Sequence, residues 1–573
     1  MVNEGLILPK DFRELVKTCC SLYEKKRDKM NSESIRKKRV KLSNYAEAFH
    51  KECETLTPSV QKKIEDLKNG KSLVLMTAHQ PNFFAYSGVY RKATLNFVLA
   101  QTLEELLRVP VVSFFGIADQ DFTDDRWVRS CQLPAAWRSG GIYSIDVKLP
   151  EKMMLNKVPR PSWDIIEKWK IDIVKWLDET LSSVKRLCKV LGFSEISSSV
   201  QLRLRENLEF FWSVVKDCAR SSDEFSDFNA FVMSKIVNEV WGYDTVFARF
   251  SECQQVFAED FRYLLSRSGD YSALLLEAKR IPCGEEVGGD VSDQEPYLAP
   301  FWYHCSCGSK VKLFLERKDG FLSGKGNCVR CEEEHEVEFG TEKNPDISNI
   351  ASCISARAIA MALVFFNGLR PLCYVGGVGG IRYLTEAQHV AAGLDVPFPT
   401  VVVWRPRDKY LGISQLEAQL EQKRVCSSLG VDEVHAAKTF LESCVSEIRR
   451  DLGKLEVLAT RVAEELRERP HDERLKKQMR EASINRSSFI KSSNLSVITH
   501  ELRTLENALT ISDLIPSIID YAVNVGMKET SSQWIKHLVE DGSLREDVCL
   551  ESMVRRPLEN DEQLSVISKD FVR

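Results

Sequence analysis

The chain lacks any stretch of about 18 apolar residues, the length that a membrane-spanning helix needs. Its N-terminus, MVNEGLILPKDF, also lacks the basic segment followed by a long apolar segment that marks a secretory signal. Most of the 17 cysteines stand singly in apolar patterns, as Cys218, Cys373 and Cys444 do, which is typical of reduced thiols acting as small hydrophobic side chains. We therefore expect a cytoplasmic protein without a disulfide framework.

A strong excess of one charge sign is missing as well. The formal net charge is -4 and the pI is near 6.2, so no global positive field argues for a nucleic-acid partner. The locally basic run from Lys25 to Lys41 is interpreted as a solvated helix face. With 573 residues, of which 43% are hydrophobic, the chain exceeds a single core and predicts two or three globular domains.

One cysteine cluster has metal-ligand spacing. Cys305-x-Cys307 is followed, after a strand-like segment, by Cys328-x-x-Cys331. Two close thiolate pairs next to glycine turns suit tetrahedral zinc and predict a zinc-ribbon insertion, with His304 and His335 as reserve ligands. Four protein ligands would close the coordination sphere, so the zinc would be structural. The alternative is four unrelated cysteines.

The segment from Ser72 to Lys92 passes from an apolar strand, Leu73 to Met76, through a polar break into an amphipathic helix opening near Ser87. Ligands of open α/β sheets bind at the carboxyl ends of such strands, and a helix terminus offers free N–H groups to anions. Thr77, His79, Gln80 and Asn82 fall at this break. An ordinary strand-to-helix turn with a hydrogen-bonded histidine explains the same residues equally well.

Two further predicted strands end in residues that suit ligand binding. The apolar run from Val111 to Phe115 leads into an acidic loop with Asp119 and Asp121, which suits an ammonium group, a ribose or Mg²⁺. The run from Leu372 to Val375 leads into GGVGG and a helix near Ile381, in which Gly376, Gly377 and Gly379 allow close approach of a phosphate. Ser355 and Arg357 precede this unit. A last strand, Thr400 to Trp404, ends in Arg405, Arg407 and Lys409. Solvated loops are the alternative throughout.

The region from Val434 to Leu466 has apolar residues at alternating steps of three and four, which is a heptad seam. The residues Glu468, Arg469, Pro470 and His471 break the seam, and it resumes from Leu495 to Leu509. This pattern predicts an antiparallel coiled-coil arm about 50 Å long. We expect the arm to mediate self-association as a homodimer, with a grip on nucleic acid or another partner as the alternative.

The order of these motifs resembles the BshC family of cysteine-adding enzymes in bacillithiol biosynthesis. MTAHQPNFFAYSGVYRKA is similar to the early strand, turn and helix of that family through Thr77, His79, Gln80, Pro81, Tyr90 and Lys92. ADQDFTDD keeps Asp119, Asp121 and Phe122, and CYVGGVGGIRYL resembles the glycine motif, including Tyr383. The chain departs from the family pattern at Ala118, Gln120, Val378 and Gly380, which suggests a shifted substrate.

The resemblance implies an α/β fold with a Rossmann-like core related to class I nucleotidyl transferases, and a coiled-coil arm used in dimers. It also implies a ligase that joins cysteine to the amine of a glucosaminyl-malate-type precursor, with ATP or a related nucleotide as activator. His79, Asp119 and Asp121 are the catalytic candidates. The substrate-binding or nucleotide-binding candidates are Thr77, Gln80, Asn82, Tyr90, Lys92, Ser355, Arg357, Gly376, Gly377, Gly379 and Tyr383. A synthetase-like nucleotide-binding or RNA-associated protein without ligase activity is the alternative.

These features divide the chain into six predicted segments. They are an N-terminal helical segment (1–70), the first part of the core with helical insertions (71–280), the zinc-ribbon insertion (281–345), the second part of the core (346–412), the arm (413–512), and terminal helices with a polar tail (513–573).

Overall fold

A parallel five-stranded sheet forms the centre of the protein in the computed structural model, which describes residues 6, 8–26, 32–281, 297–404 and 412–544. Its strands are β1 (Leu73–His79), β2 (Val111–Ile117), β5 (Val246–Arg249), β12 (Cys373–Gly376) and β13 (Thr400–Val403). The spatial order is β13-β12-β1-β2-β5, and all neighbouring pairs are parallel. This order matches that of doubly wound nucleotide-binding sheets, whose switch point here lies between β1 and β12.

The sheet is buried on both faces because its strands are apolar throughout. Leu73 and Leu75 of β1 belong to one hydrophobic core, whereas Val74 and Met76 belong to the other. Helix α4 (Ser87–Leu107) packs in the first core, and α2 (Glu33–Glu52), α3 (Pro58–Lys68) and α12 (Ala358–Leu369) pack in the second. Helix α13 (Ile381–Gly393) starts where the glycine motif predicted. Because all neighbouring strands are parallel, the polar residues that follow them meet at one edge of the sheet.

The strand predictions located these elements but misjudged their ends. β1 extends three residues beyond Met76, to His79, and β2 extends beyond Phe115 to Ile117. β12 spans Cys373–Gly376, one residue later than predicted. Residues Arg405, Arg407 and Lys409, predicted at the end of β13, lie outside the described residues.

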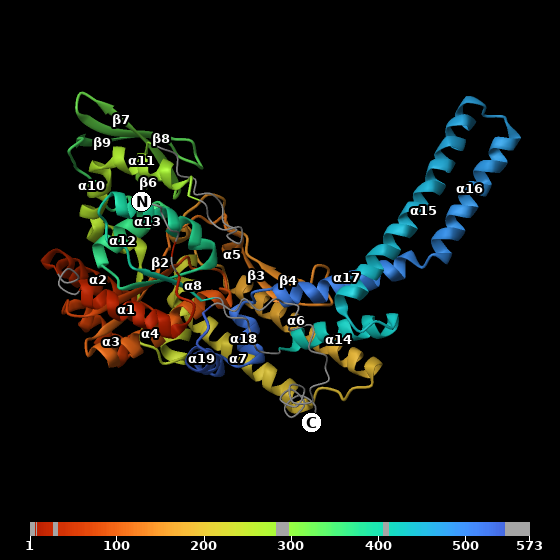
Figure 1. Ribbon diagram of the computed structural model, residues 1–573, viewed down its shortest axis with the longest axis horizontal. Coiled ribbons are helices and arrows are strands. Elements are labelled where there is room, and N and C mark those ends of the chain that lie inside the picture. Colours follow the sequence, from red (N-terminus) through yellow and green to blue (C-terminus); the bar gives the residue numbers. More distant parts are fainter. Residues whose placement is uncertain (1–5, 7, 27–31, 282–296, 405–411, 545–573) are drawn as a thin grey trace.

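A second, antiparallel sheet stands above the carboxyl ends of the parallel strands (Figure 1). Its order is β10-β9-β8-β7-β6-β11. The strands are β6 (Leu298–His304), β7 (Lys310–Lys318), β8 (Phe321–Asn327), β9 (Glu334–Thr341), β10 (Asn344–Pro345) and β11 (Ile354–Ala356). Helices α10 (Ala258–Ser266) and α11 (Ser268–Ala278) pack beside it, and β11 leads through Arg357 into α12. The second sheet is therefore anchored to the core at the edge where ligands of such folds bind.

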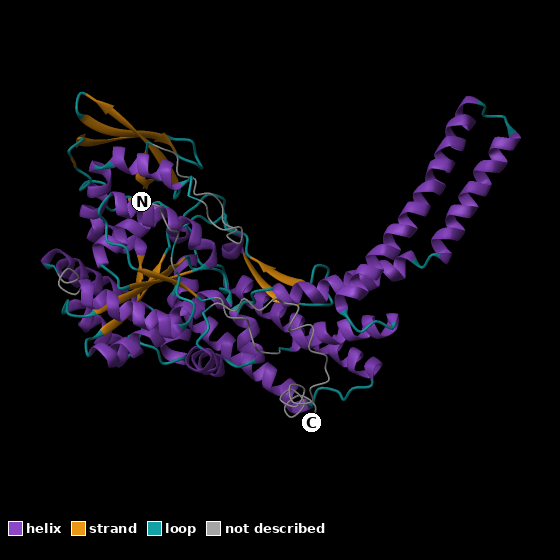
Figure 2. Ribbon diagram, in the orientation of Figure 1, coloured by secondary structure: helices purple, strands orange, loops and turns teal. Residues whose placement is uncertain are grey.

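Helices make up most of the remaining structure (Figure 2). The other helices and strands of the body are α1 (Phe12–Lys26), α5 (Arg126–Arg129), β3 (Ser130–Pro134), β4 (Ile142–Asp146), α6 (Trp163–Leu191), α7 (Ser198–Ser221), α8 (Phe225–Ser234), α9 (Phe250–Cys253), α14 (Ile413–Leu429), α18 (Ile518–Asn524) and α19 (Met527–Lys536). Within the described residues, no helix combines the length and the apolar character needed to cross a membrane.

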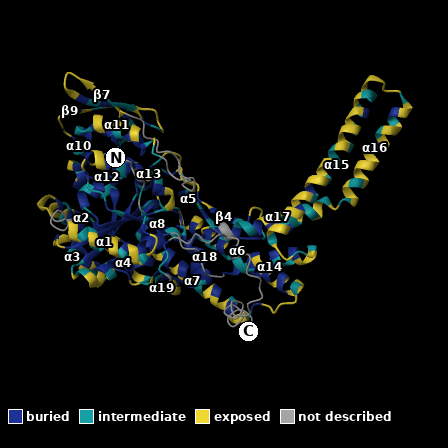
Figure 3. Cartoon of the chain, in the orientation of Figure 1, coloured by how far each residue is buried: buried dark blue, intermediate teal, exposed yellow. Residues whose placement is uncertain are grey.

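A helical hairpin projects from this body (Figure 1). Its first helix, α15 (Val434–Glu468), begins and ends close to the predicted heptad segment. The return helix is α16 (Glu473–Ser492), followed after Asn494 by α17 (Leu495–Asp513). The expectation that the return begins at Leu495 is therefore wrong, because α16 already runs back along α15. Most of α15 and α16 is exposed (Figure 3), so the hairpin buries little apolar surface within one chain.

Candidate active site

The topological switch point between β1 and β12, called the crevice below, contains a lysine from α4. The Nζ atom of Lys92 donates to the carbonyl of Ala78 at 3.3 Å, and the side chain is buried. A Cβ atom placed on Gly377 would lie 3.4 Å from this Nζ atom, so the backbone after β12 runs in van der Waals contact with the lysine. Burial lowers the pKa of Lys92 to about 7. The crevice therefore offers an ammonium group beside glycine backbone at the topological switch point.

His79, the last residue of β1, is held in one tautomer. Its Nδ1 atom lies 2.9 Å from the carbonyl oxygen of Gln80, which can only accept, so Nδ1 carries the proton. The Nε2 atom is then free to accept from the hydroxyl of Tyr86 at 3.2 Å. Burial and the nearby charge of Lys92 lower the pKa of His79 to about 3. The ring is neutral at physiological pH, which makes it a poor base and removes the positive charge expected to face phosphate.

The start of α4 is covered by the C-terminal part of the chain. The N–H group of Ser87 donates to the carbonyl of Pro516 at 2.9 Å, and the hydroxyl of Ser517 donates to the carbonyl of Phe84 at 2.8 Å. Phe84 has a positive φ of 40°, a strained conformation that these contacts help to hold. The expectation of a free N–H group at Ser87 is therefore wrong, because a segment remote in sequence already accepts from it.

The two acidic candidates after β2 have different surroundings. Asp119 is buried, and its two carboxylate oxygens accept from the backbone N–H group and the hydroxyl of Ser251. Burial raises the pKa of Asp119 to about 7, although these bonds and Arg249 oppose the shift. Asp121 is partly exposed and lines a pocket. Burial raises its pKa too, opposed by the charge of Lys310. Asp121 is thus the carboxylate that a ligand can reach.

That pocket lies between the end of β2 and the second sheet, and about 30 Å³ of it is open to the centre of a water-sized sphere. Ala118 joins it to the crevice, because the N–H group of Ala118 donates to the carbonyl of His79 at 2.9 Å. Polar groups come from Gln120, Asp121, Gln254, Lys310 and Ser355, and apolar walls come from Phe250, Phe257, Phe261, Met361 and Phe365. The crevice and the pocket are neighbouring parts of one edge of the parallel sheet.

Four further predicted residues, Thr77, Tyr383, Arg357 and Asn82, have different surroundings. The hydroxyl of Thr77 donates to the carbonyl of Val375 at 2.7 Å and ties β1 to β12. Tyr383 is hydrogen-bonded to Tyr374 and lies near enough to Asp121 for its pKa to be raised by burial and by that charge. The guanidinium of Arg357 lies 4.8 Å from the centre of the Trp302 ring. Both ends of the Asn82 amide are buried without a hydrogen-bond partner in the described part of the chain.

Tyr90 and Gly379 fit their predicted roles poorly. Tyr90 is 1% exposed and packs against Trp241 in the hydrophobic core, so the prediction of a ligand contact for its side chain is corrected. A Cβ atom on Gly379 would meet open space, whereas Gly376 ends β12 with Leu384 nearby. Among the three glycines, Gly376 has the tightest surroundings, because a Cβ atom there would lie 3.1 Å from Leu384.

Lys310 is the site residue that sequence reasoning missed. It begins β7, is 4% exposed, and its Nζ atom lies 4.7 Å from the centre of the Phe122 ring. Its pKa is lowered to about 8 by burial, while Asp121 and Asp119 oppose the shift. The signal available in the sequence was its position three residues after Cys307, which is too indirect to reveal contact with the end of β2.

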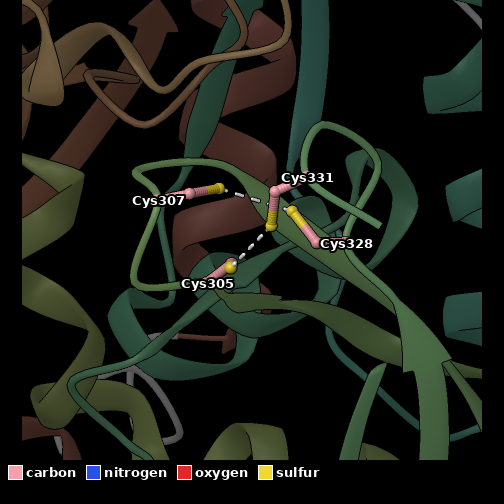
Figure 4. Close-up of side chains that lie close together, drawn as sticks. All are labelled: Cys305, Cys307, Cys328 and Cys331. Carbon is pink, nitrogen blue, oxygen red and sulfur yellow. Dashed lines mark hydrogen bonds between the residues drawn. The ribbon is translucent and has the colours of Figure 1, made fainter. Parts of the chain in front are cut away.

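The four predicted metal ligands converge (Figure 4). The Sγ atoms of Cys305 and Cys331 are 3.5 Å apart, as are those of Cys307 and Cys328, and all four lie within 4.8 Å of one another. Thiolates about 2.3 Å from a central zinc ion would be separated by about 3.8 Å in a tetrahedron. The four thiols therefore have a spacing that can hold a metal ion. Of the two reserve ligands, His335 belongs to a second possible set with Cys305 and Glu333.

Comparison with known proteins finds two relatives of this chain. A protein of Bacillus velezensis named "Putative cysteine ligase BshC" is 24% identical over 459 residues, which cover 76% of this chain and 72% of that protein. A protein of the same name from Geobacillus thermodenitrificans is 21% identical over 378 residues, or 63% of this chain and 60% of that protein. The chain is therefore similar to two proteins that carry the BshC name. No protein-family model matches it.

The departures from the BshC motifs lie around the site. Ala118 and Gln120 line the pocket, and the Gln120 carbonyl accepts from the amide of Gln254. Val378 is 37% exposed beside the crevice backbone, and Gly380 precedes α13. The altered positions are thus concentrated at the carboxyl edge of the sheet, around the pocket and the crevice.

Proposed function

We propose that the protein is a ligase that joins the carboxyl group of cysteine to the amine of a glucosaminyl-malate-type precursor. The observation that carries this proposal is the adjacency of two complementary polar sites at the carboxyl edge of the sheet. The Lys92 ammonium group and the Gly377 backbone suit an anion, and Asp121 suits an ammonium group or a proton. The curated relatives, named as cysteine ligases, supply the reaction class.

The proposed chemistry requires an activated carboxyl group, which ATP or a related nucleotide would supply as a co-substrate. Lys92 and the backbone at Gly377 would hold phosphate oxygens, because a buried ammonium group interacts strongly with an anion. The amine nitrogen then attacks the cysteine carbonyl carbon, and the activating group leaves with the electron pair of its bond. Asp121 takes the proton that the nitrogen loses, a role to which its raised pKa is suited.

Direct product analysis tests this function. The purified protein is incubated with cysteine, glucosaminyl-malate and ATP, and the mixture is examined by mass spectrometry. The expected product has the combined mass of cysteine and acceptor less one water. Cells lacking the protein should lose the corresponding cysteine-containing glycoside. Absence of the adduct together with an unchanged thiol profile would exclude the ligase.

We also propose that the second sheet is a zinc ribbon with a structural role. Cys305 and Cys307 lie in the turn between β6 and β7, and Cys328 and Cys331 lie between β8 and β9, so one ion would fasten two turns. Four thiolates leave no position for water, and the ion would support the fold without entering the reaction. Metal analysis should find one zinc ion per chain. Absence of stoichiometric metal would exclude the ribbon.

The projecting hairpin is proposed to be a coiled-coil arm through which two chains associate. Val457, Leu458 and Ile484 are exposed on α15 and α16, and their burial requires a partner. A second copy is the simplest partner because the arm carries charges of both signs. Light scattering should give twice the chain mass, and Leu458→Glu combined with Ile484→Glu should give the monomer. A monomeric wild-type protein would exclude this assembly.

A further inference from the structure

Three polar groups that line the pocket have no protein partner. Within the described residues, no carboxylate lies within ion-pair distance of the Lys310 ammonium group, whose neighbours are the rings of Phe122 and Trp302. The hydroxyl of Ser355 is buried without a hydrogen bond, and so is the Oε1 atom of Gln254. Buried polar groups in native structures are normally paired, so three unpaired groups facing one pocket indicate a place for a ligand.

The chemistry of these groups defines the ligand. An ammonium group and a hydroxyl can both donate to a carboxylate, and the Gln254 oxygen can accept from a hydroxyl or an amine. Arg357, the N-cap residue of α12 directly after β11, adds positive potential near Lys310. The apolar walls exclude water and strengthen the attraction between Lys310 and an anion. A small hydroxy acid or its conjugate satisfies all three groups.

The proposed reaction separates the two carboxylate-bearing substrates. The cysteine carboxyl group becomes the amide, so it must lie at the point of attack. The carboxylates of the acceptor are retained, so they can remain bound in a pocket beside that point. Asp121, on the rim of the same pocket, would then face the acceptor amine.

The cysteine cluster determines where Lys310 lies. The N–H group of Val329, next to Cys328, donates to the carbonyl of Lys310 at 3.0 Å. Cys328 also pairs with Val311 in an isolated antiparallel β-bridge. On the other side, the N–H group of Cys305 donates to the carbonyl of Ser309 at 2.9 Å. The backbone that carries Lys310 is therefore held between the two cysteine turns.

We infer that Lys310 and Ser355 form a carboxylate subsite for the acceptor, and that the cysteine cluster acts as a clamp that positions Lys310 in it. This inference rests on the proposed function for the identity of the acceptor. It gives the second sheet a role in substrate binding, which explains why a sheet inserted in the chain stands over the carboxyl edge of the core.

The test measures binding without turnover. Isothermal titration calorimetry is performed with L-malate and, separately, with L-cysteine, on the wild type, Lys310→Met and Lys325→Met. Methionine keeps the length of the apolar stem, and loss of a buried ammonium group without a carboxylate partner should leave the melting temperature unchanged or higher. Lys325 is the matched control, because it lies on the same sheet but is exposed and paired with Glu336 at 3.1 Å.

We expect Lys310→Met to weaken malate binding about 10-fold to 100-fold, the range for loss of a charged hydrogen bond, with cysteine binding unchanged. Lys325→Met should match the wild type. Failure of the wild type to bind malate, equal binding by Lys310→Met, or an effect on cysteine alone would overturn the inference. Lys310-dependent malate binding without any cysteine adduct would instead reject the ligase and retain the carboxylate subsite.

Discussion

The crevice and the pocket share one edge of the parallel sheet but are built differently. The crevice takes His79 and Lys92 from one short segment, and Gly377 completes it. His79 forms hydrogen bonds with Gln80 and Tyr86, and Lys92 forms one with Ala78. The pocket draws its polar groups from positions as distant as Gln120 and Ser355, and several of them have no protein partner. The contrast teaches that a local motif marks the edge where ligands bind, whereas the groups that await a ligand come from several segments.

The largest effect is expected from Asp121, which belongs to the pocket alone. Asp121→Asn should lower turnover by about 100-fold or more, since the proton acceptor is lost, and should leave the melting temperature unchanged. Rates of adduct formation measure this effect. Asp124→Asn, in the same loop but exposed and paired with Arg129 at 3.4 Å, should change the rate less than about 2-fold. Equal rates for Asp121→Asn and the wild type would remove Asp121 from the chemistry.

The next effect concerns the cysteine clamp. The double variant Cys328→Ser, Cys331→Ser should lose bound metal, and should weaken malate binding about as much as Lys310→Met does, because the backbone of Lys310 is no longer fixed. Nucleotide affinity should stay the same. Cys353→Ser, in the same region but outside the cluster, is the control. If metal is lost and malate binding is retained, the clamp does not position Lys310.

A smaller effect is expected at His79. His79→Gln and Tyr86→Phe each break the bond between the two side chains and should each weaken nucleotide binding no more than about 10-fold. The double variant should cost little more than the larger single change, because the two residues act as one unit. A loss of turnover of about 1,000-fold in His79→Gln would exceed the effect of losing one hydrogen bond. Such a loss would support the direct catalytic role that the sequence suggested.

The smallest effect is a dependence of stability on pH. The pKa of His79 is about 3 in the folded protein and about 6.5 when unfolded, so the unfolded chain binds more protons between these values. The stability contributed by the neutral ring is complete above pH 6.5 and is lost as the pH falls toward 3. Between pH 7 and 5 the wild type should lose about 2 kcal/mol more than His79→Gln in urea unfolding. Equal losses would show that the folded ring titrates normally.

Local sequence patterns predicted the parts of the fold that depend on local chemistry. The apolar runs located β1, β2 and β12, the glycine motif located the start of α13, and the cysteine spacing located the four converging thiols. The heptad seam located α15 but missed α16, whose sequence is strongly polar because little of it is buried. Local periodicity cannot reveal a helix that buries so few residues.

The unpredicted features depend on contacts between distant segments. No local pattern reveals that the carbonyl of Pro516 accepts a hydrogen bond from the N–H group of Ser87, or that Tyr90 packs against Trp241 in the core. Lys310 likewise enters the site only because the second sheet folds over the end of β2. The sequence therefore predicted which strand ends carry candidate site residues, and tertiary packing determined which of their side chains remain available to a ligand.

One pair of variants tests the division into crevice and pocket most directly. Michaelis constants for the nucleotide and for the acceptor are measured on Lys92→Met and Lys310→Met in the same adduct-forming assay. We predict that Lys92→Met raises the nucleotide constant about 10-fold or more and leaves the acceptor constant unchanged, and that Lys310→Met does the reverse. An increase of both constants in both variants would contradict the account. So would the opposite result, in which Lys92→Met raises only the acceptor constant and Lys310→Met raises only the nucleotide constant.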